Sequence, residues 1–485
     1  MLNRNFQQFK FQHQNKFNQV LYVEKKIKGN SEILNLIDNF LSEKNSFIFE
    51  SVEKGKIKGR YTIFGKKPDK IWEFNNKMSF KVQNGRKIPI KGKPQNIIEN
   101  ILENFKFKTP KRLPPICSLI SGYFSYDTIR YTEKIPDKCN NDLKIPDVRL
   151  LRPTFLIIHD NLKKKIFYII NIFKDHKIKD YKKKYDDIKK QIQELIHESK
   201  SKSINIEKLK LEKKIKVKSN TSKVQYINMV KKAKKYIKVG DIFQVVLSQR
   251  FEAKLTKKPL DIYKKLRITN PSPFMFFFNF KDFQIIGASP EILVRLRDGV
   301  ITIRPIAGTR PRGKTKKLDK FYARDLLKDK KELAEHLMLL DLGRNDVGKV
   351  SKVNSVRVTE KFSIEKYSHV MHIVSNVVGI HDKKLSKLNS LLSGFPAGTV
   401  SGAPKIRAME IIDELEKSKR KLYAGGIGYF TANQDFDTCI ALRTALIKNK
   451  KIYVQAGAGI VADSNPENEF NETVNKAKAL LKAIN

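Results

Sequence analysis

Cysteine is scarce in this chain of 485 residues: Cys117, Cys139 and Cys439 are far apart and form no CxxC pair. Such spacing argues against a disulfide framework and against a structural zinc site, and it favours a reducing compartment. No uninterrupted apolar run approaches the ~18 residues that cross a bilayer, and the amino terminus lacks the apolar segment of a secretory signal. We therefore expect a folded, cytoplasmic protein without a membrane partner.

Acidic residues are also in short supply, since 50 Asp and Glu stand against 98 Lys and Arg and the formal charge is +48. This charge could indicate a nucleic-acid partner. Lysine, however, greatly outnumbers arginine and is spread over every segment. Proteins that read nucleic acids gather charge on one face and favour Arg for bidentate contacts. We expect no nucleic-acid partner, and a basic nucleic-acid-binding protein stays a remote alternative.

The composition divides the chain into three regions. Up to about residue 180, short apolar runs alternate with Gly, Pro and Asn, which predicts strands with intervening helices. Residues 181–218 are rich in Lys and other polar residues, so we interpret them as a linker or a surface excursion. Residues 219–485 form the third region. There, apolar spacing over 221–239 predicts a helix, and the FQVVLSQRF that follows predicts a strand.

Two pairs of carboxylates are unusual in so basic a chain. Glu332 and Glu335 lie three residues apart in an apolar-periodic helix, and Glu469 and Glu472 repeat the spacing after Pro466, a plausible helix start. Like charges at this spacing disfavour a helix, so a compensating cation is expected. If the two helices face each other, the carboxylates could bind Mg²⁺, a hard ion that prefers oxygen ligands. Two solvated helix faces are the alternative.

The segment GTRPRGKT (308–315) matches the phosphate-loop pattern GxxxxGKT. Pro311 lacks an amide that such a loop uses to cradle phosphate, so nucleotide hydrolysis is disfavoured. Arg310 and Arg312 could instead lie near a small carboxylate ligand.

Three segments, 395–412, 423–430 and 454–464, place small residues where backbone must turn sharply or approach a ligand. Each alone is consistent with a tight turn. Taken with His372, Arg443 and the carboxylate pairs, they indicate a pocket for a small polyanion.

An ordered series of motifs now becomes recognisable. It runs through GDIFQVVLSQRF, NPSPFMFFFNF, IGASPEILVR, RPIAGTRPRG, KELAEHLMLLDLGRND, GFPAGTVSGAPKIRAMEII and VQAGAGIVADSNPENEFNET. The series resembles the chorismate-utilising enzymes, and within them the large subunits (component I) of anthranilate synthase. The resemblance covers nearly all of 219–485, with a weaker echo in FIFESVEKGKIKGRYTIFG and GYFSYDTIRYTEKIP.

The resemblance implies an α+β fold, a four-layer α/β/β/α sandwich with orthogonally packed antiparallel sheets. Residues 1–180 would be the regulatory region and 219–485 the chorismate-binding catalytic domain. The implied enzyme is a Mg²⁺-dependent lyase of tryptophan biosynthesis that converts chorismate and ammonia to anthranilate and pyruvate. Isochorismate or aminodeoxychorismate synthesis on the same scaffold is the alternative.

The resemblance also implies a role for individual residues. Glu335 and Glu472 would be Mg²⁺ ligands, supported by Glu332 and Glu469. Glu291 would be the general acid, a role that requires a raised carboxyl pKa, and His372 and Thr399 would assist pyruvate elimination. The substrate would be lined by Gly308, Thr309, Tyr423, Arg443, Gly457, Ala458 and Gly459.

Two positions separate this chain from its relatives. Enzymes that add water to chorismate carry a lysine base where this chain has Gln244, and a neutral amide cannot accept a proton from water. Enzymes that make aminodeoxychorismate carry a lysine nucleophile in PIKGT, whereas this chain has PIAGT with Ala307. Ammonia is therefore expected to attack the ring directly.

Partners follow from the resemblance as well. No cysteine has the setting of a glutaminase nucleophile, so a separate glutamine amidotransferase subunit (component II) would supply ammonia, in a heterotetramer. Tryptophan would inhibit by binding at Ser51, Pro273, Phe274 and Met275. A core strand rich in Phe is the alternative reading of 276–278.

Overall fold

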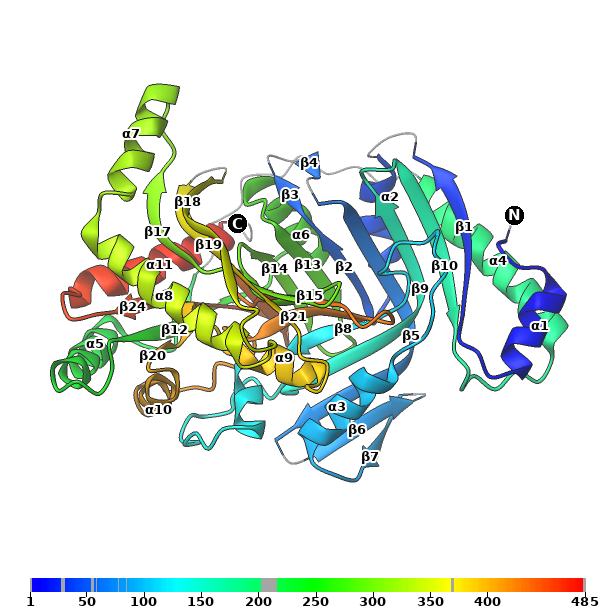
Figure 1. Ribbon diagram of the computed structural model, residues 1–485, viewed down its shortest axis with the longest axis horizontal. Helices are drawn as coiled ribbons and strands as arrows, with labels where there is room; N and C mark the ends of the chain where they lie inside the picture. Colours follow the sequence, from blue (N-terminus) through cyan, green and yellow to red (C-terminus); the bar gives the residue numbers. More distant parts are fainter. Residues whose placement is uncertain are drawn as a thin grey trace.

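Two long antiparallel strands, β5 (Tyr61–Asn75) and β9 (Val148–Asp160), run through both layers of a folded sheet (Figure 1). The computed structural model describes residues 2–27, 31–53, 56–57, 59–76, 78–83, 85–201, 216–367 and 370–482. The carboxyl half of β9 pairs with β10 (Lys165–Ile172), while its amino half pairs with β8 (Leu119–Phe124). Strand β10 belongs to one layer and strand β8 to the other. Strand β9 therefore connects the two layers.

The first layer contains β2 (Ser46–Glu50), β13 (Phe274–Asn279) and β24 (Lys451–Ile460), which include parts of the FIFES, NPSPFMFFFNF and VQAGAGIVADS motifs. Its order is β1 (Gln19–Lys26), β10, β9, β5, β2, β13, β14 (Gln284–Ser289), β23 (Thr444–Lys448), β24 and β12 (Gln244–Lys254). The short strands β11 (Lys218–Ser219) and β20 (Gly402–Ala403) pair with β12. The strand expected from FQVVLSQRF is therefore confirmed as β12.

The second layer continues from the other halves of the long strands. Its order is β7 (Arg86–Ile90), β6 (Met78–Gln83), β5, β9, β8, β21 (Gly426–Thr431), β22 (Phe436–Ile440), β15 (Ile292–Arg297), β16 (Val300–Ile303) and β19 (Val370–Ile380), which also pairs with β17 (Ile306–Pro311) and β18 (Arg357–Lys366). A separate small ladder joins β3 (Val52–Glu53) and β4 (Lys56–Ile57). Pairing between these strands is antiparallel throughout.

The helices lie outside the strands (Figure 1). They are α1 (Phe6–Gln14), α2 (Ser31–Phe40), α3 (Pro94–Asn104), α4 (Tyr181–Lys200), α5 (Lys223–Lys238), α6 (Pro259–Thr269), α7 (Lys316–Leu326), α8 (Lys330–Gly348), α9 (Lys387–Ser393), α10 (Lys405–Leu415) and α11 (Pro466–Leu481), with short 3-10 turns η1 (Tyr126–Tyr131) and η2 (Gly398–Val400). The helix expected over 221–239 is α5. It begins directly after Ser222, which forms a capping box with Gln225 in the first turn.

Side-chain alternation along β13 explains the layering. Phe276 and Phe278 lie in a core between the two layers, where Phe278 packs beside Phe47. Met275 and Phe277 face the opposite way, into a core shared with helices α2, α4 and α6. Successive strand residues point to opposite faces, so this strand is covered on both sides. Helices, two strand layers and helices follow in turn, and the expected α+β fold is confirmed.

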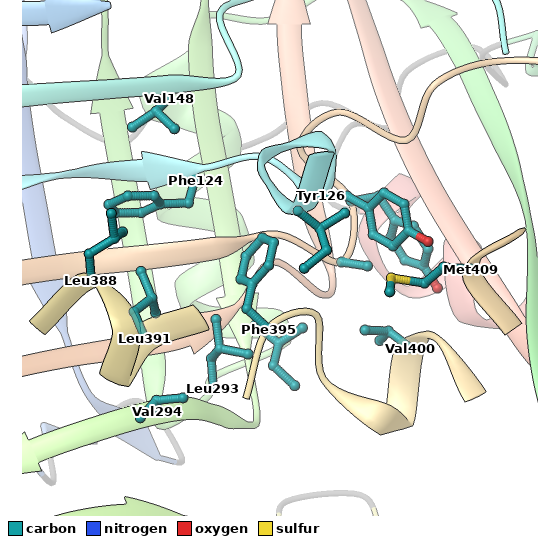
Figure 2. Close-up of a cluster of buried hydrophobic side chains, with 14 of the residues drawn as sticks. Phe124, Tyr126, Val148, Leu293, Val294, Leu388, Leu391, Phe395, Val400 and Met409 are labelled. Atoms are coloured by element: carbon teal, nitrogen blue, oxygen red, sulfur yellow. The ribbon is translucent and has the colours of Figure 1, made fainter. Parts of the chain in front are cut away.

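A third core fixes the outer face of the second layer (Figure 2). Leu388 and Leu391 of α9 and Met409 of α10 lie with Phe124 and Val148 of the amino-terminal strands. Their burial attaches α9, η2 and α10 to β8, β9 and β15, the strand that follows Glu291.

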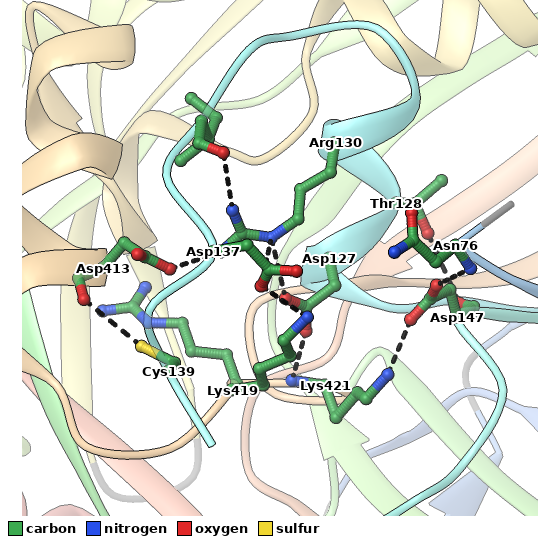
Figure 3. Close-up of polar contacts among 12 residues, drawn as sticks. Asn76, Asp127, Thr128, Arg130, Asp137, Cys139, Asp147, Asp413, Lys419 and Lys421 are labelled. Carbon is green, nitrogen blue, oxygen red and sulfur yellow. Dashed lines mark hydrogen bonds and ion pairs between the residues drawn. The ribbon is translucent and has the colours of Figure 1, made fainter. Parts of the chain in front are cut away.

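A buried polar network also joins residues 127–147 to residues 413–421 (Figure 3). Arg130 pairs with Asp413 at 2.6 Å, and Lys421 pairs with Asp147 at 2.7 Å. Asp127 accepts a hydrogen bond from the amide of Lys421 at 3.0 Å. Segments some 280 residues apart are thus held in register by charge as well as by apolar contact.

The predicted region 181–218, interpreted as a linker or a surface helical excursion, begins with the packed helix α4. In α4, Tyr185, Ile188 and Leu195 are buried against the outer core, while lysines occupy the exposed face. Residues 202–215 lie outside the described residues. The domain boundaries at 180 and 218 stay a prediction, because strands from both sides of them share one sheet. Among the described helices, none is long and apolar enough to cross a membrane.

Candidate active site

Helices α8 and α11 carry the two glutamate pairs, as the apolar spacing predicted. Asp329 caps α8 by accepting from the amides of Lys331 and Glu332, and Asn465 caps α11 by accepting from Glu467 and Asn468. α8 packs on β17 and β19, whereas α11 packs on β24. The caps and the packing set where each helix begins, and so which turn presents its carboxylates.

The carboxylates of the two helices lie within electrostatic reach of one another. Burial raises the pKa of Glu335, and the charge of Glu472 on the other helix raises it further. Burial also raises the pKa of Glu332, with Glu335 adding to the effect, and of Glu469, with Glu472 adding to it. The sequence-based alternative of two independent solvated faces is therefore wrong.

A lysine, Lys476, lies among these acids. Its Nζ is 2.6 Å from Glu472 Oε1 and donates to the carbonyl of Gly457 at 3.2 Å. Its charge also lowers the pKa of Glu335 and Glu469, against the dominant effect of burial. The sequence reasoning missed Lys476, although its position one helical turn after Glu472 was a usable signal.

The donor set fits a hard divalent ion. Carboxylate oxygens are the ligands that Mg²⁺ prefers, and a cation would offset the repulsion between Glu335 and Glu472. In the described part of the chain, one set of three donors lies within 4.8 Å, namely Asp69, Asp175 and His176. Arg152 contacts both aspartates there, so that cluster is already neutralised by an internal cation.

Gln244, at the start of β12, reaches the same carboxylates. Its Nε2 donates to Glu335 Oε1 at 3.3 Å, and its Oε1 is buried with no hydrogen-bond partner among the described residues. A Cβ on Gly459 would come within 2.6 Å of the amide nitrogen. A glycine in the neighbouring strand β24 is therefore needed for Gln244 to point at Glu335.

Glu291 occupies the turn between β14 and β15, where only 7% of its surface is exposed. Thr399 Oγ1, on η2, donates to Glu291 Oε1 at 3.0 Å. Burial raises the pKa of this carboxyl to about 8, opposed by Thr399 and by the charge of Arg443. At neutral pH the side chain is mostly protonated, so it can donate a proton as the general-acid role requires.

His372 on β19 has a defined tautomer. Its Nδ1 lies 2.8 Å from the carbonyl oxygen of Gly308 and 3.1 Å from Thr309 Oγ1. A carbonyl can only accept, so Nδ1 carries the hydrogen and Nε2 is left as an acceptor. Burial lowers the pKa of the imidazole, which keeps it neutral. Tyr367 meets the ring edge-on at 5.4 Å.

Arg443 immediately precedes β23 in the left-handed region, with φ of 47°. Burial lowers the pKa of its guanidinium. Within the described residues its side chain forms no hydrogen bond or ion pair. A buried guanidinium is costly without an anion, so this side chain is suited to receive a ligand carboxylate.

Small residues keep the floor of the site open. Gly308 has φ of +65°, and a Cβ there would lie 3.1 Å from Glu332 Oε2. A Cβ on Gly457 would lie 2.7 Å from the hydroxyl of Tyr423. Gly457, Ala458 and Gly459 run along β24 opposite β12. The predicted substrate-lining residues therefore surround the same region as Glu335 and Glu472.

The structure agrees that GTRPRGKT is not a phosphate loop. Residues 306–311 form strand β17 against β19 rather than a loop. Arg310 pairs with Asp325, Asp329 and Glu332, and Arg312 pairs with Asp319. Internal carboxylates thus hold both arginines, and that they lie near a ligand carboxylate stays a prediction.

The four predicted inhibitor residues, Ser51, Pro273, Phe274 and Met275, line one cavity of about 660 Å³. Glu50 lies in its wall. Its Oε1 accepts from Tyr263 at 2.7 Å and from Arg267 at 2.8 Å. Phe276, Phe277 and Phe278, further along the strand, are core residues. The structure thus divides the motif between a cavity wall and a core.

Comparisons with known proteins agree with this arrangement. The pattern of the chorismate binding enzyme family matches residues 45–482. Anthranilate synthase component 1 from Cereibacter sphaeroides is 45% identical over 96% of this chain and 94% of its own length, and that from Acetivibrio thermocellus is 45% identical over 93% and 92%.

Solved structures give the same picture. Anthranilate synthase component I from Streptococcus pneumoniae superposes with a TM-score of 0.78 at 39% identity, covering 88% of this chain and 93% of that one. The menaquinone-specific isochorismate synthase from Escherichia coli has a TM-score of 0.71 at 18% identity, over 96% and 95%. It shares the fold alone. The chain belongs to the chorismate-binding enzyme family and, within it, to the group of anthranilate synthase component 1 proteins.

Proposed function

We propose that this chain converts chorismate and ammonia to anthranilate and pyruvate. The observation that carries the proposal is the near full-length identity of 45% to anthranilate synthase component 1. The site supports it, because a buried acid, Glu291, and a neutral imidazole, His372, both lie within electrostatic reach of Arg443, whose side chain has no partner among the described residues.

Glu291 is the proposed proton donor. Loss of the ring hydroxyl as ammonia attacks leaves negative charge on the departing oxygen, and a positioned acid neutralises it. A carboxyl with a pKa of about 8 holds that proton at neutral pH. The hydroxyl of Thr399 fixes Oε1 and so orients the proton-bearing face.

His372 is the proposed proton acceptor in the elimination of pyruvate. The Gly308 carbonyl holds the hydrogen on Nδ1, so Nε2 offers a lone pair. Because burial keeps the ring neutral, it can accept the ring proton whose removal makes the product aromatic.

The substrate's carboxylates are proposed to meet Arg443 and the backbone amides near Gly457, Ala458 and Gly459. Gln244 cannot act as a base toward water, because its amide is neutral and already donates to Glu335. Ala307 supplies no amine for covalent attack. Ammonia is therefore the direct nucleophile.

Mg²⁺ is the proposed cofactor. Glu335 and Glu472 would hold it, with Glu332 and Glu469 in support, and Lys476 would have to release Glu472. When bound, the ion would offset the charge of a substrate carboxylate. This makes the proposed enzyme a Mg²⁺-dependent lyase.

The ammonia is proposed to come from a glutamine amidotransferase partner. Burial raises the pKa of the Cys117 thiol to about 12 and also raises those of Cys139 and Cys439. None of these thiols is a ready nucleophile. The purified chain should therefore use ammonium salts but not glutamine, and the cytoplasm is the proposed setting of a heterotetramer with that partner.

Tryptophan is the proposed inhibitor. The cavity of about 660 Å³ holds both apolar wall residues and the Glu50 carboxylate, whose Oε2 is buried and has no hydrogen-bond partner among the described residues. Charged residues such as Arg112 and Arg295 also line it, and a site that combines apolar walls with charged groups suits a zwitterionic amino acid.

The test is to incubate the chain with chorismate, ammonium and Mg²⁺ and to identify the product. Fluorescent anthranilate with release of pyruvate supports the proposal. Isochorismate formed without ammonia, or an aminated product that retains the enolpyruvyl group, would assign one of the alternative activities instead.

A further inference from the structure

The wall of the amino-acid cavity and the proposed general acid lie on paired strands. Phe274, in the cavity wall, is directly opposite Ser289 in the ladder of β13 and β14. Ser289 is two residues before Glu291. Only one strand pair therefore separates Phe274 from the turn that carries Glu291.

A series of hydrogen bonds follows the same route. The amide of Val52, next to Ser51, donates to the carbonyl of Ser272 at 3.0 Å. Ser272 Oγ donates to the carbonyl of Ser289 at 2.7 Å. The amide of Glu291 donates to Ser289 Oγ at 3.4 Å. Ser272 is 3% exposed and Ser289 is fully buried, so water cannot easily replace these bonds.

A second cavity, of about 750 Å³, adjoins the first. Both cavities are lined by Ser51, Pro273 and Phe274. The second is also lined by Pro290 and Ile292, the two neighbours of Glu291. The backbone that carries the acid therefore faces open space, and close packing does not hold it from that side.

We propose that Ser272 is a positioning residue that couples the amino-acid cavity to Glu291 through Ser289. An amino acid seated against Pro273 and Phe274 displaces the 272–274 segment. The Ser272–Ser289 bond carries that displacement to the carbonyl before Pro290, and Glu291 moves relative to Thr399. The proposal rests on inhibition by tryptophan, and it assigns the connection to one hydroxyl group.

The test compares Ser272→Ala with Ser272→Thr, which keeps a hydroxyl, in the full-length chain. Ammonia-dependent kcat and KM are measured over a range of tryptophan concentrations, and tryptophan binding is measured by calorimetry. Ser272→Ala should lower kcat without raising KM and should still bind tryptophan. Its half-inhibitory concentration should rise about tenfold, the scale of a typical coupling between two sites. Ser272→Thr should restore both properties.

Ser46→Ala is the matched control, because Ser46 Oγ, on the neighbouring strand β2, donates to the carbonyls of Leu41 and Glu43 beside the far end of β13 from Phe274. It should lose a similar buried bond yet keep wild-type inhibition. Inhibition of Ser272→Ala at wild-type tryptophan concentrations would overturn the relay. If the wild-type chain neither binds nor responds to tryptophan, the proposed regulation fails, and the relay fails with it.

Discussion

Burial decides what each carboxyl group of the site can do. Glu291 is enclosed, so its pKa rises to about 8. The side chain of Glu472 is 45% exposed and forms an ion pair with Lys476. The same residue type can thus hold a proton in one place and form an ion pair in another, because desolvation disfavours the ionised form only where water is excluded.

Replacing Glu291 by Gln should remove the proton donor without changing the shape of the site. We expect kcat to fall about a hundred- to ten-thousand-fold, the usual contribution of general acid catalysis, while chorismate binding persists. Steady-state assays and calorimetry measure the two effects. Glu467→Gln, at an exposed position on α11, is the control and should keep wild-type activity.

The pH dependence of the rate gives an independent test of the same carboxyl group. The acid must be protonated to act, so the wild-type rate should be highest below a pH of about 8 and should decline as pH rises through that value. The decline should be absent from the residual rate of Glu291→Gln. A wild-type rate that stays constant well above pH 8 would contradict the assignment.

At the scale of single elements, the cap of α11 sets the position of one predicted metal ligand, Glu472, and of its supporting residue Glu469. Asn465 accepts from two amides of the first turn, at 3.0 and 3.2 Å. Asn465→Ala should lower the free energy of unfolding by about 0.5–2 kcal/mol, as for other lost caps. It should also raise the Mg²⁺ concentration required for half-maximal rate.

Denaturant unfolding and a Mg²⁺ titration measure these effects. Asn471→Ala, at an exposed position within the same helix, is the control. An unchanged Mg²⁺ requirement in Asn465→Ala would show that the first turn does not position the ligands.

Much of the position of the helices could be predicted from the sequence, but their contacts could not. Apolar spacing placed α5 and the glutamates of α8 and α11 correctly, because periodicity records which face is buried. It could not show that Lys476 reaches Gly457 across to β24, since that contact joins a helix to a strand. GTRPRGKT matches a phosphate loop by its letters alone, and its arginines instead form ion pairs with Asp319 and Asp325.

At the scale of the whole molecule, the amino-terminal third is part of the catalytic body. Lys421 and Asp147 form an ion pair in which both side chains are buried, at 4% and 7% exposure. Composition predicted a boundary near residue 180. It could not predict that strands from both sides of that boundary pair with each other, because this pairing joins residues far apart in the sequence.

Replacing Lys421 by Met should leave Asp147 buried without its cation. Breaking one side of a buried pair costs about 3–5 kcal/mol, and the loss should appear in one cooperative transition of the whole chain. Lys451→Met, which breaks an exposed pair with Glu252, should cost at most about 1 kcal/mol. Denaturant unfolding followed by fluorescence and circular dichroism measures both. Separate transitions for the two probes would show that the regions unfold independently.

The proposed binding of a divalent ion between α8 and α11 is tested most directly by the Mg²⁺ dependence of anthranilate formation from chorismate and ammonium. The wild-type chain should be inactive in excess chelator and should recover when Mg²⁺ is restored. Glu335→Gln should need far more Mg²⁺ or remain inactive, whereas Glu410→Gln, on α10, should match the wild type. Full-rate anthranilate formation by the wild-type chain in excess chelator would contradict the account.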